Sequence, residues 1–127
     1  MNGISMPVGL QHDHDNVFRV DIRGTLHKAD LDRCQREIAA EIGRFGKVRL
    51  LFVLDRFEGW DAADNWRDLS FYVRHGDAID RIAIVGDERW RDLALMFANA
   101  DLRKGPVEYF SADAVAEAQA WLSEGAA

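Results

Sequence analysis

Four carboxylates are grouped in one short stretch that follows an apolar run. They are Asp55, Glu58, Asp61 and Asp64. Carboxylates at this spacing suit acid–base work or the binding of a cation. The structural alternative is that Asp61 or Asp64 caps the next helix, while Asp55 and Glu58 are solvated or paired with Arg56. Because no His or Cys completes a ligand set there, we favour the structural alternative and predict no metal site.

A second polar group precedes the first long apolar segment. His12, Asp13, His14 and Asp15 follow one another, and two histidines two residues apart on a strand end share a face. A metal site needs ordered ligands and groups that orient them. A polar hairpin turn explains the same residues, and it is the interpretation we favour.

Motifs of the common catalytic classes are missing from the sequence. There is no Gly-x-Ser-x-Gly around any of the four serines, and no Gly-Lys-Ser/Thr loop for phosphates. Gly86-Asp87-Glu88 lacks a glycine-rich fingerprint. The single cysteine, Cys34, lies on the apolar stripe of a predicted helix and is expected to be buried. We therefore predict a protein that is not an enzyme and needs no cofactor.

Aromatic residues accompany the acidic stretch. Phe57 and Trp60 follow the apolar run, and Trp90 begins the helix after the next strand. The carboxyl ends of parallel strands meet at one edge of a sheet, where ligands usually bind. These rings either line a shallow apolar pocket or simply cover the sheet end.

The elements that must position these side chains can be read from the hydrophobic pattern. Strands are predicted at Val8–His12, Val17–Arg23, Val48–Leu54, Arg81–Val85 and Pro106–Phe110. Helices are predicted from an Asp30 cap to about Arg44, over Ala62–His75 and Glu88–Ala98, and after a Ser111 cap. Phe57–Trp60 is expected to be a loop.

The second predicted helix has one anomaly. Its apolar stripe is Ala62, Trp66, Leu69 and Val73, and at about 100° per residue Phe71 points the opposite way, among charged neighbours. An apolar ring among charges suggests a contact surface. A single exposed Phe is also common, so both readings stand.

This order of elements predicts an α/β fold. A hairpin is followed by alternating helices and strands, which favours a mostly parallel sheet of about five strands with four helices and right-handed crossovers. The hairpin adds an antiparallel edge. No linker or repeat divides the 127 residues, so residues 1–127 are expected to form a single domain.

Charge and hydropathy narrow the choice of partners. The net charge is −6, and the basic residues are scattered. This composition argues against nucleic acid and against an anionic membrane surface. No segment is long and apolar enough to span a bilayer, so stable membrane insertion is not expected, and no signal peptide is recognised. A cytoplasmic location is the expectation.

The sequence resembles the SpoIIAA-like group of the STAS superfamily. The resemblance rests on Gly24-Thr25-Leu26, Leu50–Asp55, Phe57–Trp60, Arg81–Asp87 with Trp90, and Tyr109-Phe110 with Ala118 and Trp121-Leu122. It implies the SpoIIAA-like fold, which lipid-carrying Sec14-like (CRAL-TRIO) domains share in outline, and a small non-enzymatic module. It does not fix a ligand.

One departure from the family concerns its switch. Anti-sigma-factor antagonists in this superfamily carry a phosphorylated Ser or Thr just after the central strand. Residues 55–64 here contain no Ser, Thr or Tyr, and their acidic side chains would repel a phosphate. The phospho-switch therefore cannot be carried over to this chain.

Two functions remain from the sequence. The first is a non-enzymatic interaction module that binds a protein partner or itself through the second helix and its preceding loop. The alternative is a Sec14-like binder of a small apolar ligand or lipid around Trp60, Trp90 and Phe97. The candidate binding residues are Asp55, Phe57, Glu58, Trp60, Phe71 and Trp90.

Overall fold

A five-stranded sheet forms the centre of the protein in the computed structural model, which describes residues 7–66 and 68–124. Its strands lie in the order of the sequence: β1 (Val8–His14), β2 (Val17–Leu26), β3 (Val48–Trp60), β4 (Ile79–Gly86) and β5 (Val107–Ser111). β1 pairs with β2 antiparallel, and every other neighbouring pair is parallel. The predicted mixed sheet with an antiparallel hairpin at one edge is confirmed.

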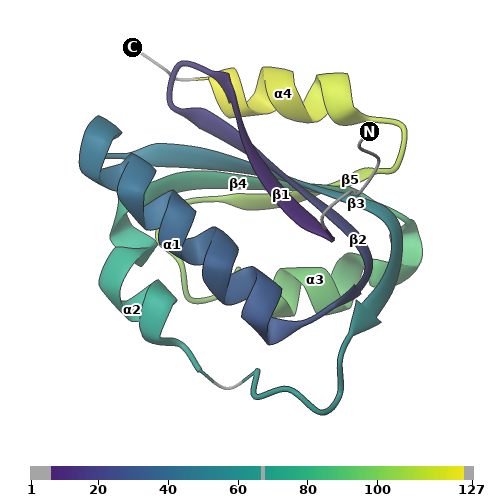
Figure 1. Ribbon diagram of the computed structural model, residues 1–127. Coiled ribbons are helices and arrows are strands. Elements are labelled where there is room, and N and C mark those ends of the chain that lie inside the picture. The colour runs from purple at the N-terminus through teal and green to yellow at the C-terminus, as the bar shows by residue number, and fades with distance from the viewer. Residues whose placement is uncertain (1–6, 67, 125–127) are drawn as a thin grey trace, which may run out of the picture.

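Helices cover both faces of this sheet unequally. α1 (Lys28–Phe45), α2 (Ser70–His75) and α3 (Arg91–Phe97) lie against one face, and α4 (Val115–Ser123) lies alone against the other (Figure 1). We call these the three-helix face and the α4 face. Among the described residues, no helix combines the length and hydropathy needed to cross a membrane.

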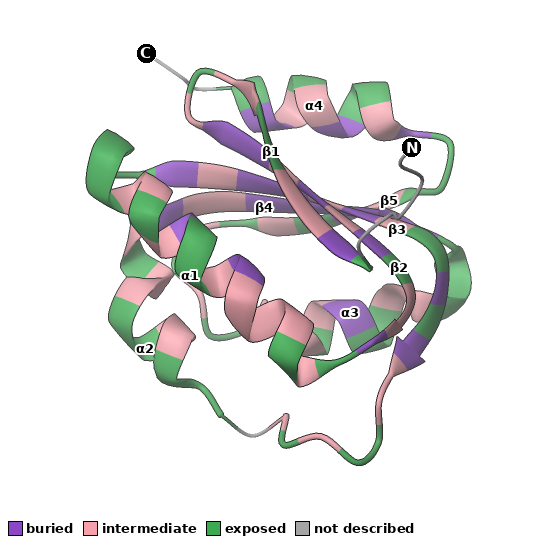
Figure 2. Cartoon of the chain, viewed as in Figure 1, coloured by how far each residue is buried: buried purple, intermediate pink, exposed green. Residues whose placement is uncertain are grey.

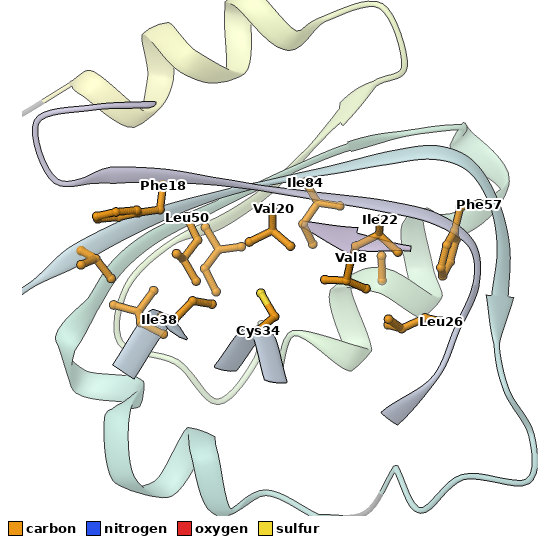
Figure 3. Close-up of a cluster of buried hydrophobic side chains, with 14 of the residues drawn as sticks. Val8, Phe18, Val20, Ile22, Leu26, Cys34, Ile38, Leu50, Phe57 and Ile84 are labelled. Carbon is orange, nitrogen blue, oxygen red and sulfur yellow. The ribbon is translucent and has the colours of Figure 1, made fainter. Parts of the chain in front are cut away.

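Side chains that alternate along β3 contribute to the hydrophobic cores on both faces of the sheet. Leu50 points to the three-helix face, whereas Leu51 and Val53 point to the α4 face, and all three are buried. Figure 2 shows buried segments along the strands of the sheet. Successive strand residues face opposite sides, so a strand covered on both sides must be apolar on both parities. On the three-helix face, Cys34 and Ile38 of α1 pack against this surface (Figure 3). Cys34 is buried, as predicted.

β3 is longer than the sequence suggested, and this corrects the prediction of a loop at Phe57–Trp60. The strand runs on to Trp60, pairing Phe57 with Gly24 and Trp60 with Leu26 of β2. The register shifts after Arg23 and again after Gly24, and Arg56, at the first shift, has a positive φ of 52°. Such a bulge adds one residue to one strand and increases the local twist. Charged residues at 55, 56 and 58 concealed this continuation of the strand.

The helix predicted over Ala62–His75 is also wrong in its first half. Of the described residues in this range, only α2, Ser70–His75, is helical, and the strap before it, residues 61–66 and 68–69, has an irregular conformation. Asp61 accepts a hydrogen bond from the Ala63 amide at 2.9 Å, and Asp68 accepts one from the Ser70 amide at 3.0 Å. Aspartates that bond nearby amides compete with helical hydrogen bonds, which explains the late start.

Three predicted helix caps are replaced by other contacts. α1 begins at Lys28, whose amide donates to the Asp64 carboxylate at 2.9 Å, so Asp64 serves α1 instead of α2. Asp30 lies inside the first turn of α1. Ser111 belongs to β5, and its hydroxyl hydrogen-bonds Asp113 instead of capping α4.

Candidate functional site

A cavity of about 110 Å³ lies between the three-helix face of the sheet and helices α1, α2 and α3. Its walls come from β2, β3 and β4 above and from the helices below. Every lining residue is apolar or aromatic except Gln35 and Arg103. The cavity is large enough for a small molecule and offers it few polar contacts.

Two successive register shifts in β3 allow both Phe57 and Trp60 to lie in the cavity wall. Before the bulge, Leu50, Phe52 and Leu54 line the cavity, two residues apart. The first register shift, at Arg56, turns Phe57 toward the cavity, and the second, at Glu58, restores the original parity, so that Trp60 lines the cavity as well. Without the bulge, the strict alternation of a strand would turn Phe57 to the opposite face.

Aromatic rings close the end of the cavity near the carboxyl ends of the strands. The centroid of Phe57 lies 4.9 Å from that of Trp60 and 5.0 Å from that of Trp90, and Trp60 lies 5.1 Å from Phe97 of α3. Edge-to-face pairs at these distances are favourable. Three predicted site residues, Phe57, Trp60 and Trp90, are thus brought together. Trp90 lies behind the other two and does not line the cavity.

Gly59 is needed for this aromatic contact. It has a φ of +103°, and a Cβ atom there would lie 3.2 Å from the ring of Trp90. Glycine is the residue that tolerates such backbone conformations without strain. The Gly59 of the family-like Phe57–Trp60 segment is therefore explained by the close approach of Trp90.

Phe71 faces the cavity, which reverses the sequence prediction. It lines the cavity and packs on the core, whereas Val73, predicted to be inward, is 76% exposed. The predicted stripe assumed one helix from Ala62, but α2 begins only at Ser70, so the positions before it carry no helical phase. Phe71 is half-buried and is therefore not the isolated outward ring expected from the sequence.

Arg103 is the one charged residue of the cavity wall, and no motif or spacing in the sequence pointed to it. It lies in the irregular segment after α3. Its Nε donates to the Ala98 carbonyl at 2.7 Å, and its guanidinium lies 5.1 Å from the centroid of the Tyr72 ring. Its Nη1 is buried and has no hydrogen-bond partner. Burial lowers the pKa of Arg103, although an arginine stays charged at neutral pH.

A second hollow of about 260 Å³ adjoins the cavity, and we call it the vestibule. The two spaces share lining residues, namely Leu31, Gln35, Phe71, Phe97 and Arg103. Leu69 and Met96 also line the vestibule and are 44% and 70% exposed. The vestibule therefore forms an entrance lined by apolar and polar residues alike, between α1, the strap, α2 and α3.

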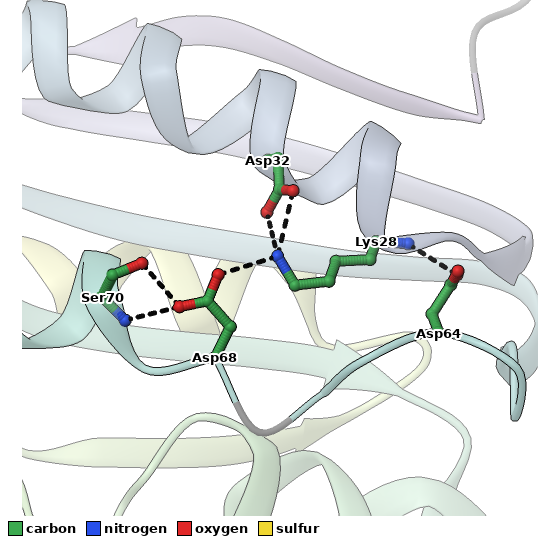
Figure 4. Close-up of polar contacts among 5 residues, drawn as sticks. All are labelled: Lys28, Asp32, Asp64, Asp68 and Ser70. Atoms are coloured by element: carbon green, nitrogen blue, oxygen red, sulfur yellow. Dashed lines mark hydrogen bonds and ion pairs between the residues drawn. The ribbon is translucent and has the colours of Figure 1, made fainter.

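Lys28 ties the strap to α1 at this entrance (Figure 4). Its amide reaches Asp64, and its Nζ lies 2.9 Å from Asp32 and 3.1 Å from Asp68. Hydrogen bonds from Ser70 and then from Lys28 lower the pKa of Asp68. The bond to Asp32, and after it the bond to Asp68, raises the pKa of Lys28, although burial acts in the opposite direction. We call these residues the Lys28 network.

The acidic residues singled out in the sequence do not enter the cavity. Asp55 and Glu58 are exposed, and Asp55 pairs with Arg23 at 3.2 Å. Asp55 and Trp90 line a separate polar groove on the outer side of the strand ends, where Arg19 and Asp21 also form an ion pair at 3.0 Å. The groove therefore mixes charges of both signs that are largely paired with each other.

Two groups of possible metal ligands have other partners. His27 Nδ1 lies 2.9 Å from Asp61 and 3.8 Å from Asp64, close enough for one ion to be shared. Both carboxylates, however, already accept backbone amides. In the hairpin, His12 contacts the Asp15 carbonyl and His14 the Ser123 hydroxyl of α4. These contacts fit the structural interpretation of the hairpin residues.

Comparison with known proteins supports the fold. A family model described as SpoIIAA-like matches residues 17–123. The crystal structure of an uncharacterised DUF3478-family protein from Shewanella loihica, with a SpoIIAA-like fold, has a TM-score of 0.69 at 20% identity, covering 94% of this chain and 99% of that one. No curated protein matches. The family match and the sheet topology together show that this chain belongs to the SpoIIAA-like family.

Proposed function

We propose that this protein binds a small, mainly apolar molecule in the cavity and does not catalyse a reaction. The observation that carries this proposal is a partly enclosed space walled by aliphatic and aromatic side chains, with the vestibule adjoining it. Sites of this kind bind ligands by apolar burial and orient them with few polar groups.

The size of the cavity limits the ligand. An apolar cavity of about 150 Å³ in another protein stays dry and binds benzene. At about 110 Å³ the present cavity has room for only a short chain or one small ring. A longer tail would have to continue into the vestibule.

An unfilled cavity is also energetically expensive. Cavity formation in protein cores costs about 24 cal/mol per Å³ of volume, which for this cavity is about 3 kcal/mol. Native proteins are stable by only about 5–15 kcal/mol. A ligand that fills the space would recover contacts for the lining side chains, and this is a reason for it to bind.

Native mass spectrometry of freshly purified protein tests this proposal, followed by titration of stripped protein with octanoate and octan-1-ol. We expect adducts of small apolar mass, and saturable binding seen as a change in tryptophan fluorescence, because Trp60 lines the cavity. No adduct and no saturable binding of either compound up to millimolar concentration would overturn the proposal.

Regulatory binding of a protein partner is the second candidate. Exposed apolar side chains favour it: Val73 on α2, Met96 on α3 and Leu102 after α3. They replace the anchors expected from the sequence, since Phe57 and Phe71 face the cavity. Val73→Asp should weaken any self-association seen by light scattering. A monomeric wild-type protein would contradict the self-association form of this candidate.

A further inference from the structure

Arg103 has hydrogen-bonding capacity that the fold does not use. Its structural role is accounted for by Nε, which donates to the Ala98 carbonyl at the end of α3. Cations near a helix carboxyl end are favourable. Nη1 is a separate, buried donor without a partner. A buried donor that loses water and gains nothing costs about 1–3 kcal/mol, and more when it is charged.

Other arginines of the protein show that this is not a general feature. Arg19, Arg23 and Arg33 each pair with an aspartate at 3.0–3.2 Å. Arg91 pairs with Glu88 at 2.6 Å. Within residues 7–66 and 68–124, no carboxylate lies within 4.0 Å of the Arg103 guanidinium, although the chain has 22 acidic residues. Exposed arginines such as Arg36 and Arg74 also lack an ion pair among the described residues, but Arg103 combines that lack with a buried Nη1.

We propose that the ligand of the cavity is a small monocarboxylic acid with an apolar tail, whose carboxylate accepts a hydrogen bond from Arg103 Nη1. This inference rests on the proposed function, since it names the class of molecule bound there. The tail would contact the aliphatic and aromatic walls, and the head would meet the one cation that lines both cavity and vestibule.

The expected charge of the ligand's head group follows from the number of cations in the cavity wall, which is one. A carboxylate carries one negative charge and can match one guanidinium. A dianionic head such as a phosphate would keep a charge unpaired in a largely apolar space, which is unfavourable. Trp60 Nε1 is a second buried donor of the cavity wall without a partner, so a neutral acceptor group on the tail would also be tolerated.

The overall charge of the protein makes the proposal easy to test. At a net charge of −6, unspecific binding should favour a neutral compound over an anion of the same chain length. A preference for the acid must therefore come from a local cation. Octanoate, octan-1-ol and methyl octanoate share one chain and differ only in the head.

The experiment is calorimetric titration of the three compounds into the wild-type protein, Arg103→Met and Lys104→Met at pH 7.5. Lys104 is the matched control, because it is the adjacent cation and lines neither cavity nor vestibule. For the wild type and Lys104→Met, we expect octanoate to bind at least about tenfold more tightly than octan-1-ol. In Arg103→Met, this ratio should fall to about one, with octan-1-ol affinity retained.

The outcomes separate this inference from the proposed function. If octan-1-ol and methyl octanoate bind the wild type as tightly as octanoate, the acid preference is wrong and the apolar site stands. If the preference survives in Arg103→Met, the carboxylate is bound by another group and the inference fails. If none of the compounds binds, the proposed function itself fails. Should Arg103→Met not fold, the wild-type comparison of acid and alcohol still decides.

Discussion

The two faces of the sheet are built from the same strands, yet they pack differently. On the α4 face, Leu51 and Val53 meet Ala118 and Leu122 of a single helix, and all are buried. On the three-helix face, Leu50 lines the cavity although it is itself 2% exposed. One helix with a small residue at its centre approaches closely, whereas three helices around a bent strand leave space between them.

This difference suggests that the cavity is not a failure of the sequence to fill a core. The chain fills one face with the same residue types that line the other. Interiors are normally close-packed, so a retained space beside a well-packed face points to use. The comparison can be tested by changing matched residues on the two faces.

Leu50→Ala and Leu51→Ala give the largest expected effects. Removing a buried leucine costs about 2–5 kcal/mol, and the cost rises with the volume left behind. Leu51 lies on the closely packed face, so we expect about 4 kcal/mol there. Leu50 already borders a cavity and has fewer contacts to lose, so we expect about 2–3 kcal/mol. Urea denaturation measures both, and a larger loss for Leu50→Ala would contradict the comparison.

Filling the two faces should have opposite consequences. Ala94 lines the cavity, so Ala94→Leu should keep or raise stability and should weaken octanoate binding by about tenfold or more. Ala118 is fully buried on the α4 face, where the same change should cost about 1–3 kcal/mol through overpacking. Thermal melts and calorimetry check the pair. If Ala94→Leu binds octanoate with wild-type affinity, the cavity is not the site.

The smallest expected effect is a change in stability at low pH, which should differ between the two faces. The pKa of Asp68 is lowered in the folded protein from an ordinary value of 3.8. Its stabilising contribution is therefore present above about pH 3.8 and is lost as pH falls through the lower folded pKa. Asp68→Asn should lower the melting temperature at pH 7 by at most about 2–3 °C, because exposed ion pairs contribute little.

The α4 face supplies the control for this pH dependence. Arg49 and Arg81 donate to carbonyls at the end of α4, at 2.6 and 2.7 Å, and these contacts do not titrate in acid. Hydrogen exchange should therefore accelerate in the strap as pH falls from 5 to 3, after correction for intrinsic rates, but not in α4. Equal acceleration in both segments would show that the Lys28 network does not hold the entrance.

The fold was largely predictable because long apolar segments carried it. The two-sided pattern of Val48–Leu54 predicted a covered strand and a parallel sheet, and the resemblance added the family. The bulge at Arg56 was not predictable, because it depends on pairing with Arg23 and Gly24 of β2. The charged residues in this part of the sequence suggested a loop, but hydrogen bonding to β2 continues the strand.

The site was only partly predictable. Phe57, Trp60 and Trp90 were expected to meet at the carboxyl end of the strands, and they do. Phe71 was assigned the wrong direction because the helical phase was extended through the strap, whose described residues, 61–66 and 68–69, are not helical. Arg103 was missed because its setting arises from α2, α3 and Tyr72 together, which no spacing in the sequence reveals.

The most direct test of the proposed site is to locate the bound ligand in solution. Intermolecular nuclear Overhauser effects should be measured between octanoate and the protein's methyl groups. The account predicts contacts from the tail to Ala94 and Ile82, which line the cavity, and none to Ala83 and Ala118 on the α4 face. Contacts confined to the α4 face or to the strand-end groove would contradict it.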